Sequence, residues 1–184
     1  MRVIAGEAKG RRLVAPKGYD IRPTADRVKE SIYNILGTAP QGALVLDLFA
    51  GSGNLGIEAL SRGASKAYFI DSKRQAIELI RKNLEVTGLA ERAEIIQSEA
   101  ERIIPRLSEM GAAFDLIFLD PPYRISVSQV GAVIEKLASC CMNDGAMLVY
   151  EHDSKVNPLE IVGLAFISTR SYGDTAVSFY RKEG

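Results

Sequence analysis

The sequence predicts an α/β protein whose doubly wound, mostly parallel sheet ends in an antiparallel hairpin. Between residues 44 and 151, short apolar runs alternate with stretches of helical periodicity, which is the pattern of repeated βαβ units. A glycine-rich segment follows the first of these runs, and the turn Tyr172-Gly173-Asp174 separates two apolar runs near the end, as in a β-hairpin. With 184 residues, the chain is long enough for one domain with a sizeable core.

The predicted elements begin with a basic extension. Residues 1–22 alternate weakly and lack the apolar content of a domain, so we expect a small N-terminal hairpin with basic side chains on its exposed face. Residues 23–184 form the α/β domain, led by a helix that stops at Gly37 and carries Arg27 and Lys29 away from its apolar stripe. The other expected elements are strands at 44–49, 66–71, 93–97, 114–119 and 146–151, helices at 55–61, 74–86, 99–110 and 127–140, and hairpin strands at 164–170 and 176–180.

The charge distribution favours a polyanionic partner on one side of the molecule. The net charge is zero, yet residues 1–30 carry eight Lys or Arg against four Asp or Glu, although a solvated charged surface gives the same pattern. The adjacent Cys140 and Cys141 end an apolar helical pattern without a Cys/His cluster for a metal, so we interpret them as core residues in a reducing cytoplasm. Neither a signal-peptide pattern nor an apolar run of ~20 residues is present, and we expect a soluble cytoplasmic protein.

The segment Asp120-Pro121-Pro122-Tyr123 ends an apolar run that is typical of a buried strand. The two prolines stop the strand because neither can donate to a sheet ladder. Asp120 and the Pro121 carbonyl can accept hydrogen bonds from a planar amino group, and Tyr123 can stack on the ring that carries it. Such acceptors support attack by a weakly nucleophilic amine. A tight turn without a functional role is the alternative interpretation.

The glycine-rich segment runs from Asp47 to Gly56 and includes Gly51 and Gly53. Its Gly-x-Gly-x-x-Gly spacing permits a nicotinamide dehydrogenase, in which the helix N-terminus faces a pyrophosphate. Asp47 argues against that interpretation, because a carboxylate four residues before the first glycine suits a cationic ligand better. S-adenosylmethionine brings an ammonium and a sulfonium to this position. Asp71, at the end of the second predicted strand, can bind the ribose hydroxyls of either ligand.

Three motifs carry a resemblance that covers nearly the whole chain. They are Arg22-Pro-Thr-Ala-Asp-Arg-Val-Lys-Glu30, the segment from Asp47 to Gly63, and Phe118-Leu-Asp-Pro-Pro-Tyr123. With these motifs the chain resembles the RsmD-type 16S ribosomal RNA guanine-N2 methyltransferases of bacteria. The resemblance implies a Rossmann-like class I methyltransferase fold, S-adenosylmethionine as the cofactor, and methylation of a guanine amino group in 16S rRNA within the small-subunit particle or its assembly intermediate. A monomer suffices for an enzyme that docks on such a particle.

The resemblance also assigns residues to roles. The catalytic group is Asp120, Pro121, Pro122 and Tyr123, and the cofactor-binding group is Asp47, Phe49, Gly51, Gly53, Asp71 and Glu99. One position departs from the usual pattern, because Ser98 stands where an acidic residue often holds the adenine, and either Glu99 or the backbone makes that contact. Arginine binds phosphate with paired donors, so we assign rRNA contacts to Arg11, Arg12, Arg22 and Arg27.

Several alternatives remain open at this stage. The same enzyme class acts on DNA adenine or protein glutamine, although the basic N-terminal segment favours nucleic acid. A nicotinamide oxidoreductase leaves the Asp-Pro-Pro-Tyr motif unexplained. A non-catalytic rRNA-binding assembly factor would not require the glycine-rich segment and the Asp-Pro-Pro-Tyr motif, so the presence of both argues against it. We expect His152 to have no direct role, since the amino group can lose its proton to water after attack, and we expect Glu58 to make surface or packing contacts.

Overall fold

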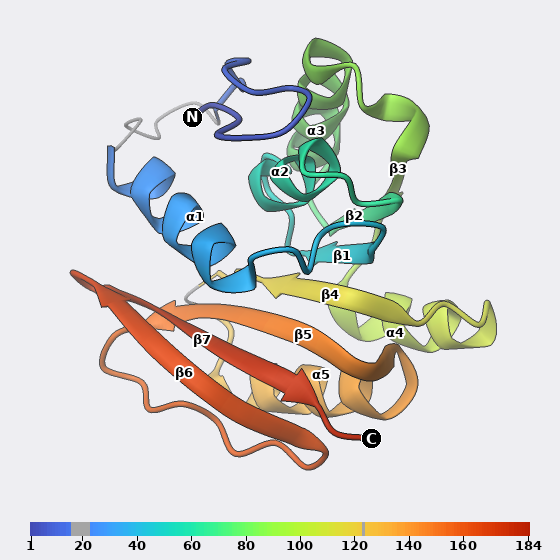
Figure 1. Ribbon diagram of the computed structural model, residues 1–184. Helices are drawn as coiled ribbons and strands as arrows, with labels where there is room; N and C mark the ends of the chain where they lie inside the picture. Colours follow the sequence, from blue (N-terminus) through green and yellow to red (C-terminus); the bar gives the residue numbers. More distant parts are fainter. Residues whose placement is uncertain (16–22, 123) are drawn as a thin grey trace.

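The computed structural model, which describes residues 1–15, 23–122 and 124–184, is built on one twisted sheet (Figure 1). Its seven strands have the order β3-β2-β1-β4-β5-β7-β6. Strands β1 to β5 pair in parallel, whereas β7 pairs antiparallel with both β5 and β6. The predicted doubly wound sheet with a terminal antiparallel hairpin is therefore confirmed.

The elements, in chain order, are α1 Pro23–Leu36, β1 Leu44–Leu48, α2 Asn54–Ser61, β2 Lys66–Asp71, α3 Arg74–Thr87, a short 3-10 turn Ala90–Arg92, β3 Ala93–Gln97, α4 Ala100–Glu109, β4 Phe114–Leu119, α5 Val127–Cys140, β5 Met142–Asp153, β6 Leu164–Tyr172 and β7 Thr175–Lys182. The predicted bounds are close to these except at the start of β5, which we expected at 146. There the pairing with β4 shifts register between Phe114 and Leu116, and Gly145 adopts a positive φ of 77°. The sequence Asn143-Asp144-Gly145 resembles a turn, but it is an irregularity inside the strand.

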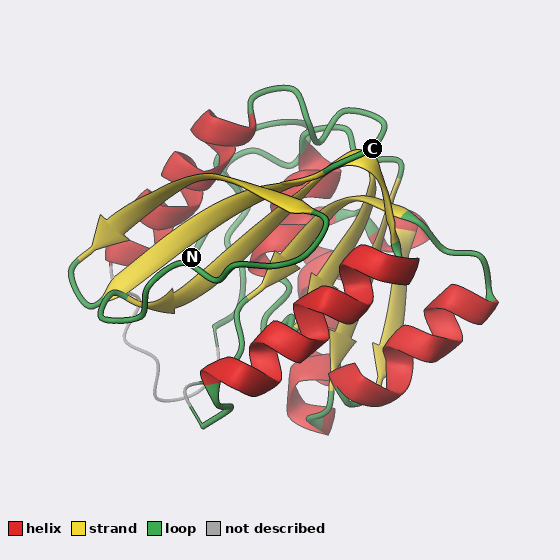
Figure 2. Cartoon of the chain, turned by 90° about the horizontal axis from the view of Figure 1, so that it is seen from below, coloured by secondary structure: helices red, strands yellow, loops and turns green. Residues whose placement is uncertain are grey.

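Helices cover both faces of the sheet and define two apolar cores. Helices α1, α2 and α3 pack on the face that carries Val45, Phe118 and Val149. Helices α4 and α5 pack on the opposite face, which carries Leu119 and Tyr150, and they lie in front of the sheet when the molecule is viewed from below (Figure 2). Successive side chains of a strand point to opposite faces of the sheet. The core that one residue joins therefore shows that the next residue along the strand lies on the opposite face.

The N-terminal arm, residues 1–15, is fastened to α2 by hydrogen bonds to a buried side chain of that helix. Residues 1–3 and 10–13 pair antiparallel, as expected for a small hairpin, through the Arg2–Arg12 bridge and backbone hydrogen bonds on either side of it, but the described residues of the arm form no extended strand. The amides of Ile4 and Ala5 donate to the Glu58 carboxylate at 2.8 and 3.0 Å, and Glu58 is fully buried. Glu58 thus makes packing contacts, as predicted, but in the interior. The division predicted at residue 22 falls in the segment outside the described residues and stays a prediction.

Lys29 corrects our expectation for α1. We placed it off the apolar stripe, but the arm covers it and leaves only 1% of it exposed. Its Nζ donates to the Arg2 carbonyl at 2.6 Å and to Asn54 Oδ1 at 2.7 Å, and it lies 3.1 Å from Glu58 Oε2. Burial lowers the pKa of Lys29, and the Glu58 charge opposes that shift. Lys29 therefore joins the arm, α1 and the start of α2.

Candidate functional site

The candidate site lies where β2, β1, β4 and β5, which are adjacent in the sheet, reach their carboxyl ends. Ligands bind at this edge in open α/β sheets, where the strand order reverses. In this sheet the reversal lies between β1 and β4, which pair directly. The glycine loop follows β1, and the Asp-Pro-Pro segment follows β4. The topology thus brings the two sequence motifs to neighbouring positions.

Asp47 fixes the glycine loop through a hydrogen bond to the backbone of its last glycine. Asp47 is 3% exposed, and its Oδ2 accepts a hydrogen bond from the Gly56 amide at 2.8 Å. A Cβ on Gly56 would lie 2.4 Å from Phe69 Cε1, so only glycine lets the start of α2 approach the sheet this closely. Gly56 is therefore a packing residue.

Gly51 differs from Gly56 in that its surroundings are open. Its φ is +55°, and the nearest atom that an added Cβ would meet is the Phe49 carbonyl oxygen at 4.0 Å. The loop also holds Phe49 at a φ of 68°, the one positive value found among the described residues other than glycine. Such a conformation is strained for a side chain with a Cβ. The backbone around Gly51 leaves room for a ligand to approach closely.

Asp71 fixes the other side of the loop. Its Oδ2 accepts from the Gly51 amide at 3.0 Å, and its Oδ1 accepts from the Lys73 amide at 2.9 Å. Each carboxylate oxygen has a further lone pair for a ligand hydroxyl. The predicted cofactor residues Asp47, Gly51, Gly53 and Asp71 are thus brought together around one loop.

The electrostatics of this loop suit a cation. Burial raises the pKa of Asp47 to about 8, against the lowering effect of the Gly56 hydrogen bond, and the charges of Asp120 and Asp71 raise it further. A positive group placed beside these carboxylates would favour their charged forms. This group of carboxylate acceptors therefore fits the ammonium and sulfonium of S-adenosylmethionine better than a diphosphate.

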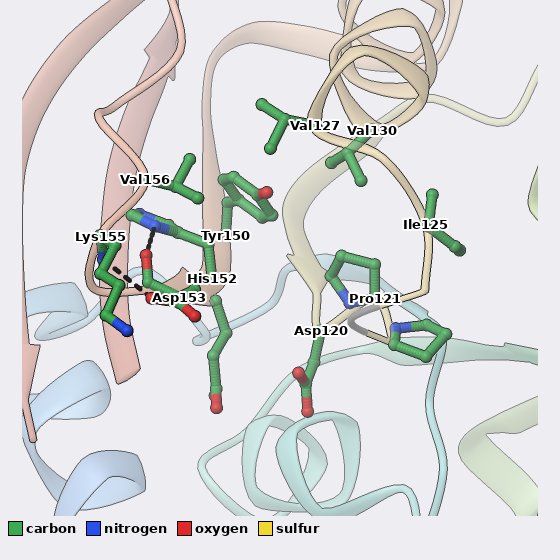
Figure 3. Close-up of a pocket in the computed structure, with 12 residues that line it drawn as sticks. Asp120, Pro121, Ile125, Val127, Val130, Tyr150, His152, Asp153, Lys155 and Val156 are labelled. Carbon is green, nitrogen blue, oxygen red and sulfur yellow. Dashed lines mark hydrogen bonds between the residues drawn. The ribbon is translucent and has the colours of Figure 1, made fainter. Parts of the chain in front are cut away.

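A cavity of about 340 Å³ opens beside the loop, between the ends of β4 and β5. Asp120, Pro121 and Pro122 line it from β4, while Tyr150 and the three residues after it line it from β5. Figure 3 shows Asp120 and Pro121 on one side of this hollow and Tyr150 and His152 on the other. Val127 and Val130 of α5 form an apolar part of the cavity wall. The cavity size suits one base-sized ligand.

Three carboxyl groups line this cavity, those of Asp120, Glu151 and Asp153, and only Asp120 was predicted from the sequence as a site residue. Solvent reaches Asp120 in the open cavity, but protein atoms crowd it and limit its hydration, which raises its pKa to about 6. Burial raises the pKa of Glu151 to about 8, and the Asp120 charge contributes. The strand register pairs Leu119 with Tyr150, so the next residues, Asp120 and Glu151, are also neighbours. Glu151 ends a predicted strand, but only this register reveals its position.

His152 lines the same cavity but is engaged in the fold. Its Nδ1 lies 2.9 Å from the Asp153 carbonyl oxygen and its Nε2 lies 2.8 Å from Ser178 Oγ. The ring also packs on Tyr150 with centroids 4.8 Å apart. Both ring nitrogens therefore have partners within the protein, which agrees with the expectation that His152 has no direct role.

The remaining predicted residues lie elsewhere or outside the described chain. Glu99 precedes α4 and pairs with Arg102 at 3.2 Å, so its contact with adenine stays a prediction. Arg11 is exposed and donates to the Val86 carbonyl near the end of α3, while Arg12 and Arg27 are exposed. Tyr123 and Arg22 lie outside the described residues.

The chain is similar to known proteins over its full length. The profile of the family described as "Conserved hypothetical protein 95" matches residues 1–181. A Bacillus subtilis protein named "Putative rRNA methyltransferase YlbH" is 42% identical, covering 100% of both chains. The "Ribosomal RNA small subunit methyltransferase D" of Haemophilus influenzae is 34% identical, over 86% of this chain and 81% of its own.

The chain belongs to this family. The resemblance found in its three motifs is thereby confirmed. A solved structure described as "Putative methyltransferase yhhF from Escherichia coli" superposes with a TM-score of 0.84 at 30% identity, covering 100% of this chain and 98% of that one. The family membership and this superposition confirm the Rossmann-like methyltransferase fold. Within the described parts of the chain, no helix has the length and apolar character needed to cross a membrane.

Proposed function

We propose that the protein transfers a methyl group from S-adenosylmethionine to the exocyclic N2 amino group of a guanine in 16S ribosomal RNA. The observation that carries this proposal is the position of Asp120 and Pro121 at the mouth of a base-sized cavity, next to the glycine loop. Relatives named as ribosomal RNA small subunit methyltransferases support the choice of rRNA. We further propose that the substrate is the small-subunit particle or its assembly intermediate, and that the protein acts there as a cytoplasmic monomer.

The residues around the glycine loop would hold the cofactor. Its positive end would lie over Asp47 and Gly51, and the free lone pairs of Asp71 would accept hydrogen bonds from the ribose hydroxyls. When bound, S-adenosylmethionine supplies an electrophilic methyl group on sulfur. The loop is already fixed by the Gly51 and Gly56 hydrogen bonds, so the cofactor meets a site that needs little rearrangement.

The residues after β4 would orient the target base. Asp120 and the Pro121 carbonyl accept hydrogen bonds from the guanine amino group and hold its nitrogen in line with the methyl carbon. The nitrogen lone pair forms the new N–C bond while the S–C bond breaks, and the amino proton then leaves to water. Asp120 stabilises the positive charge that develops on nitrogen, and alignment supplies much of the remaining rate.

The basic side chains would bind the RNA backbone. Arg12 and Arg27 are exposed, and Arg2, which is bridged to Arg12, lies 3.9 Å from Asp26 of α1. These residues place positive charge where the arm meets α1. Arg11 already donates one N–H to Val86, so we expect it to contribute less to phosphate binding than Arg12 and Arg27.

The deciding experiment measures transfer of labelled methyl groups to small-subunit particles and to naked rRNA that lack the modification, followed by nucleoside analysis. We expect label in N2-methylguanine, and a higher yield on whichever substrate the protein docks with. In parallel reactions with DNA and with protein acceptors, label in N6-methyladenine of DNA or in protein glutamine would replace the proposed substrate. Tight cofactor binding without transfer to any acceptor would overturn the catalytic proposal and favour a non-catalytic assembly factor.

A further inference from the structure

A second carboxyl group, that of Glu151, lines the cavity beside Asp120 and could bind the target base. Phe118 and Val149 pair in the β4–β5 register and enter the same core. Leu119 and Tyr150 also pair and enter the opposite core. Side chains alternate between faces along each strand, so the next pair, Asp120 and Glu151, returns to the face of Phe118. The two carboxyl groups thus leave adjacent strand ends on one side of the sheet and line one cavity.

Within the described residues, the carboxyl groups of Glu151 and Asp120 are free to bind a ligand, whereas the neighbouring His152 and Asp153 are engaged in the fold. Both ring nitrogens of His152 have partners within the protein, and Asp153 Oδ1 accepts from the Lys155 amide at 2.9 Å. Among hydrogen bonds between described residues, none reaches the carboxyl oxygens of Asp120 or Glu151. A desolvated carboxyl group beside another carboxylate is costly, and donors from a ligand would relieve that cost.

Guanine has the donors that two adjacent acceptors require. Three RNA bases carry an exocyclic amino group, but only in guanine is the neighbouring ring nitrogen a donor, N1–H. In adenine and cytosine the corresponding ring nitrogen is an acceptor. An acceptor placed beside the one that holds the amino group therefore distinguishes guanine from the other two bases on their Watson–Crick edges.

We infer that Glu151 is the residue that selects guanine, accepting the N1–H hydrogen while Asp120 and the Pro121 carbonyl accept from the N2 amino group. This inference rests on the proposed function and adds to it a specificity residue. A bound guanine would place two N–H donors between two carboxyl groups and reduce their mutual repulsion. A base with an acceptor at this position would instead direct a lone pair at Glu151.

The test measures guanine preference, defined as the transfer rate on guanine divided by the rate on 2-aminopurine at the same RNA position. 2-Aminopurine keeps the amino group but has an unprotonated N1. The particles are reconstituted with each base at the position that the wild-type protein labels. Wild type is compared with Glu151→Met, which removes the acceptor, and Glu151→Gln, whose amide can also donate to N1. Glu135→Gln, on the exposed surface of α5, is the matched control.

We expect guanine preference to fall about 10- to 100-fold in Glu151→Met, which is the range for one specific base contact. The decrease should come from a slower reaction on guanine. In Glu151→Gln the preference should also fall, but through a faster reaction on 2-aminopurine. A purely structural role would change both rates together and leave the guanine preference unchanged. Comparing the preference between wild type and variant cancels the intrinsic reactivity of each base.

An unchanged guanine preference in both variants, with normal binding of S-adenosylhomocysteine, would overturn the inference and leave the proposed function intact. If Glu151→Met does not fold, Glu151→Gln alone decides the matter. Absence of N2-methylguanine from the wild-type reaction would overturn the inference and the proposed function together.

Discussion

The carboxyl edge of the sheet has two halves that use acidic residues in opposite ways. In the cofactor half, at the ends of β1 and β2, Asp47 and Asp71 accept hydrogen bonds from three backbone amides. In the base half, at the ends of β4 and β5, Asp120 and Glu151 face a cavity, and no hydrogen bond from a described residue reaches their carboxyl oxygens.

The difference shows how one edge of a sheet can bind the same cofactor in every turnover and also act on a substrate. Carboxylates that brace a loop give it a fixed shape, as a cofactor used in every turnover requires. Carboxyl groups without internal partners are costly to the fold, but their lone pairs remain available to the substrate. We therefore expect changes in the two halves to affect different properties of the protein.

Removing the free acceptor should abolish the reaction but not cofactor binding. We expect Asp120→Ala to reduce methyl transfer by about 100- to 1000-fold, as for loss of one group that stabilises transition-state charge. Cofactor binding should stay nearly intact, because Asp120 lines the base half and no hydrogen bond joins it to the described residues of the glycine loop. Single-turnover rates and calorimetric titration with S-adenosylhomocysteine measure the two effects separately. Asp144→Ala, on an exposed residue near the other end of β5, should change neither. Near-normal turnover in Asp120→Ala would remove Asp120 from the mechanism.

Overpacking the cofactor half should destabilise the whole fold. In Gly56→Ala the added Cβ would lie 2.4 Å from Phe69 and 3.1 Å from Asp47 Oδ2, which should cost about 1–3 kcal/mol of unfolding free energy. Denaturant titration measures this loss. Gly131→Ala, in α5 with no atom within 4 Å of the added Cβ, should instead gain a few tenths to about 1 kcal/mol. Equal stability of the two variants would contradict the packing role of Gly56.

The base half should make the reaction depend on pH. Asp120 accepts amino hydrogens best when ionised, and its pKa is raised to about 6, so the transfer rate should increase as pH rises through that value. Between pH 5 and pH 7 we expect about a tenfold increase in kcat/KM, which reports the pKa values of the unliganded protein. A rate that is constant, or that increases as the pH falls, would show that Asp120 does not act as the charged acceptor.

The smallest effect should come from the open glycine of the cofactor half. Gly51→Ala forces alanine to a φ of +55° without a steric clash, so we expect a loss of about 1 kcal/mol in stability together with weaker cofactor binding. Gly111→Ala, which has a φ of +69° and open surroundings, should cost similar stability and leave cofactor affinity unchanged. Equal cofactor affinity in both variants would mean that the ligand does not approach Gly51.

Local patterns in the sequence were enough to predict most of the fold and half of the site. Apolar runs and helical spacing predicted every strand and helix of the sheet unit, because burial follows local periodicity. The glycine loop and the Asp-Pro-Pro segment were likewise evident, since both functions depend on residues that are contiguous in the chain. The start of β5 was not, because a strand irregularity at Gly145 has the composition of a turn.

The sequence by itself determined the parallel sheet, its terminal hairpin, the cofactor loop and the identity of the first acceptor, Asp120. Only the tertiary structure decided that Lys29 is buried beneath the arm and that Glu151 stands beside Asp120. Both depend on contacts between segments far apart in the chain: Lys29 is covered by residues 1–15, and Glu151 is positioned by the β4–β5 register. Local periodicity carries no information about which distant segment covers a charge or which strand end lies next to another.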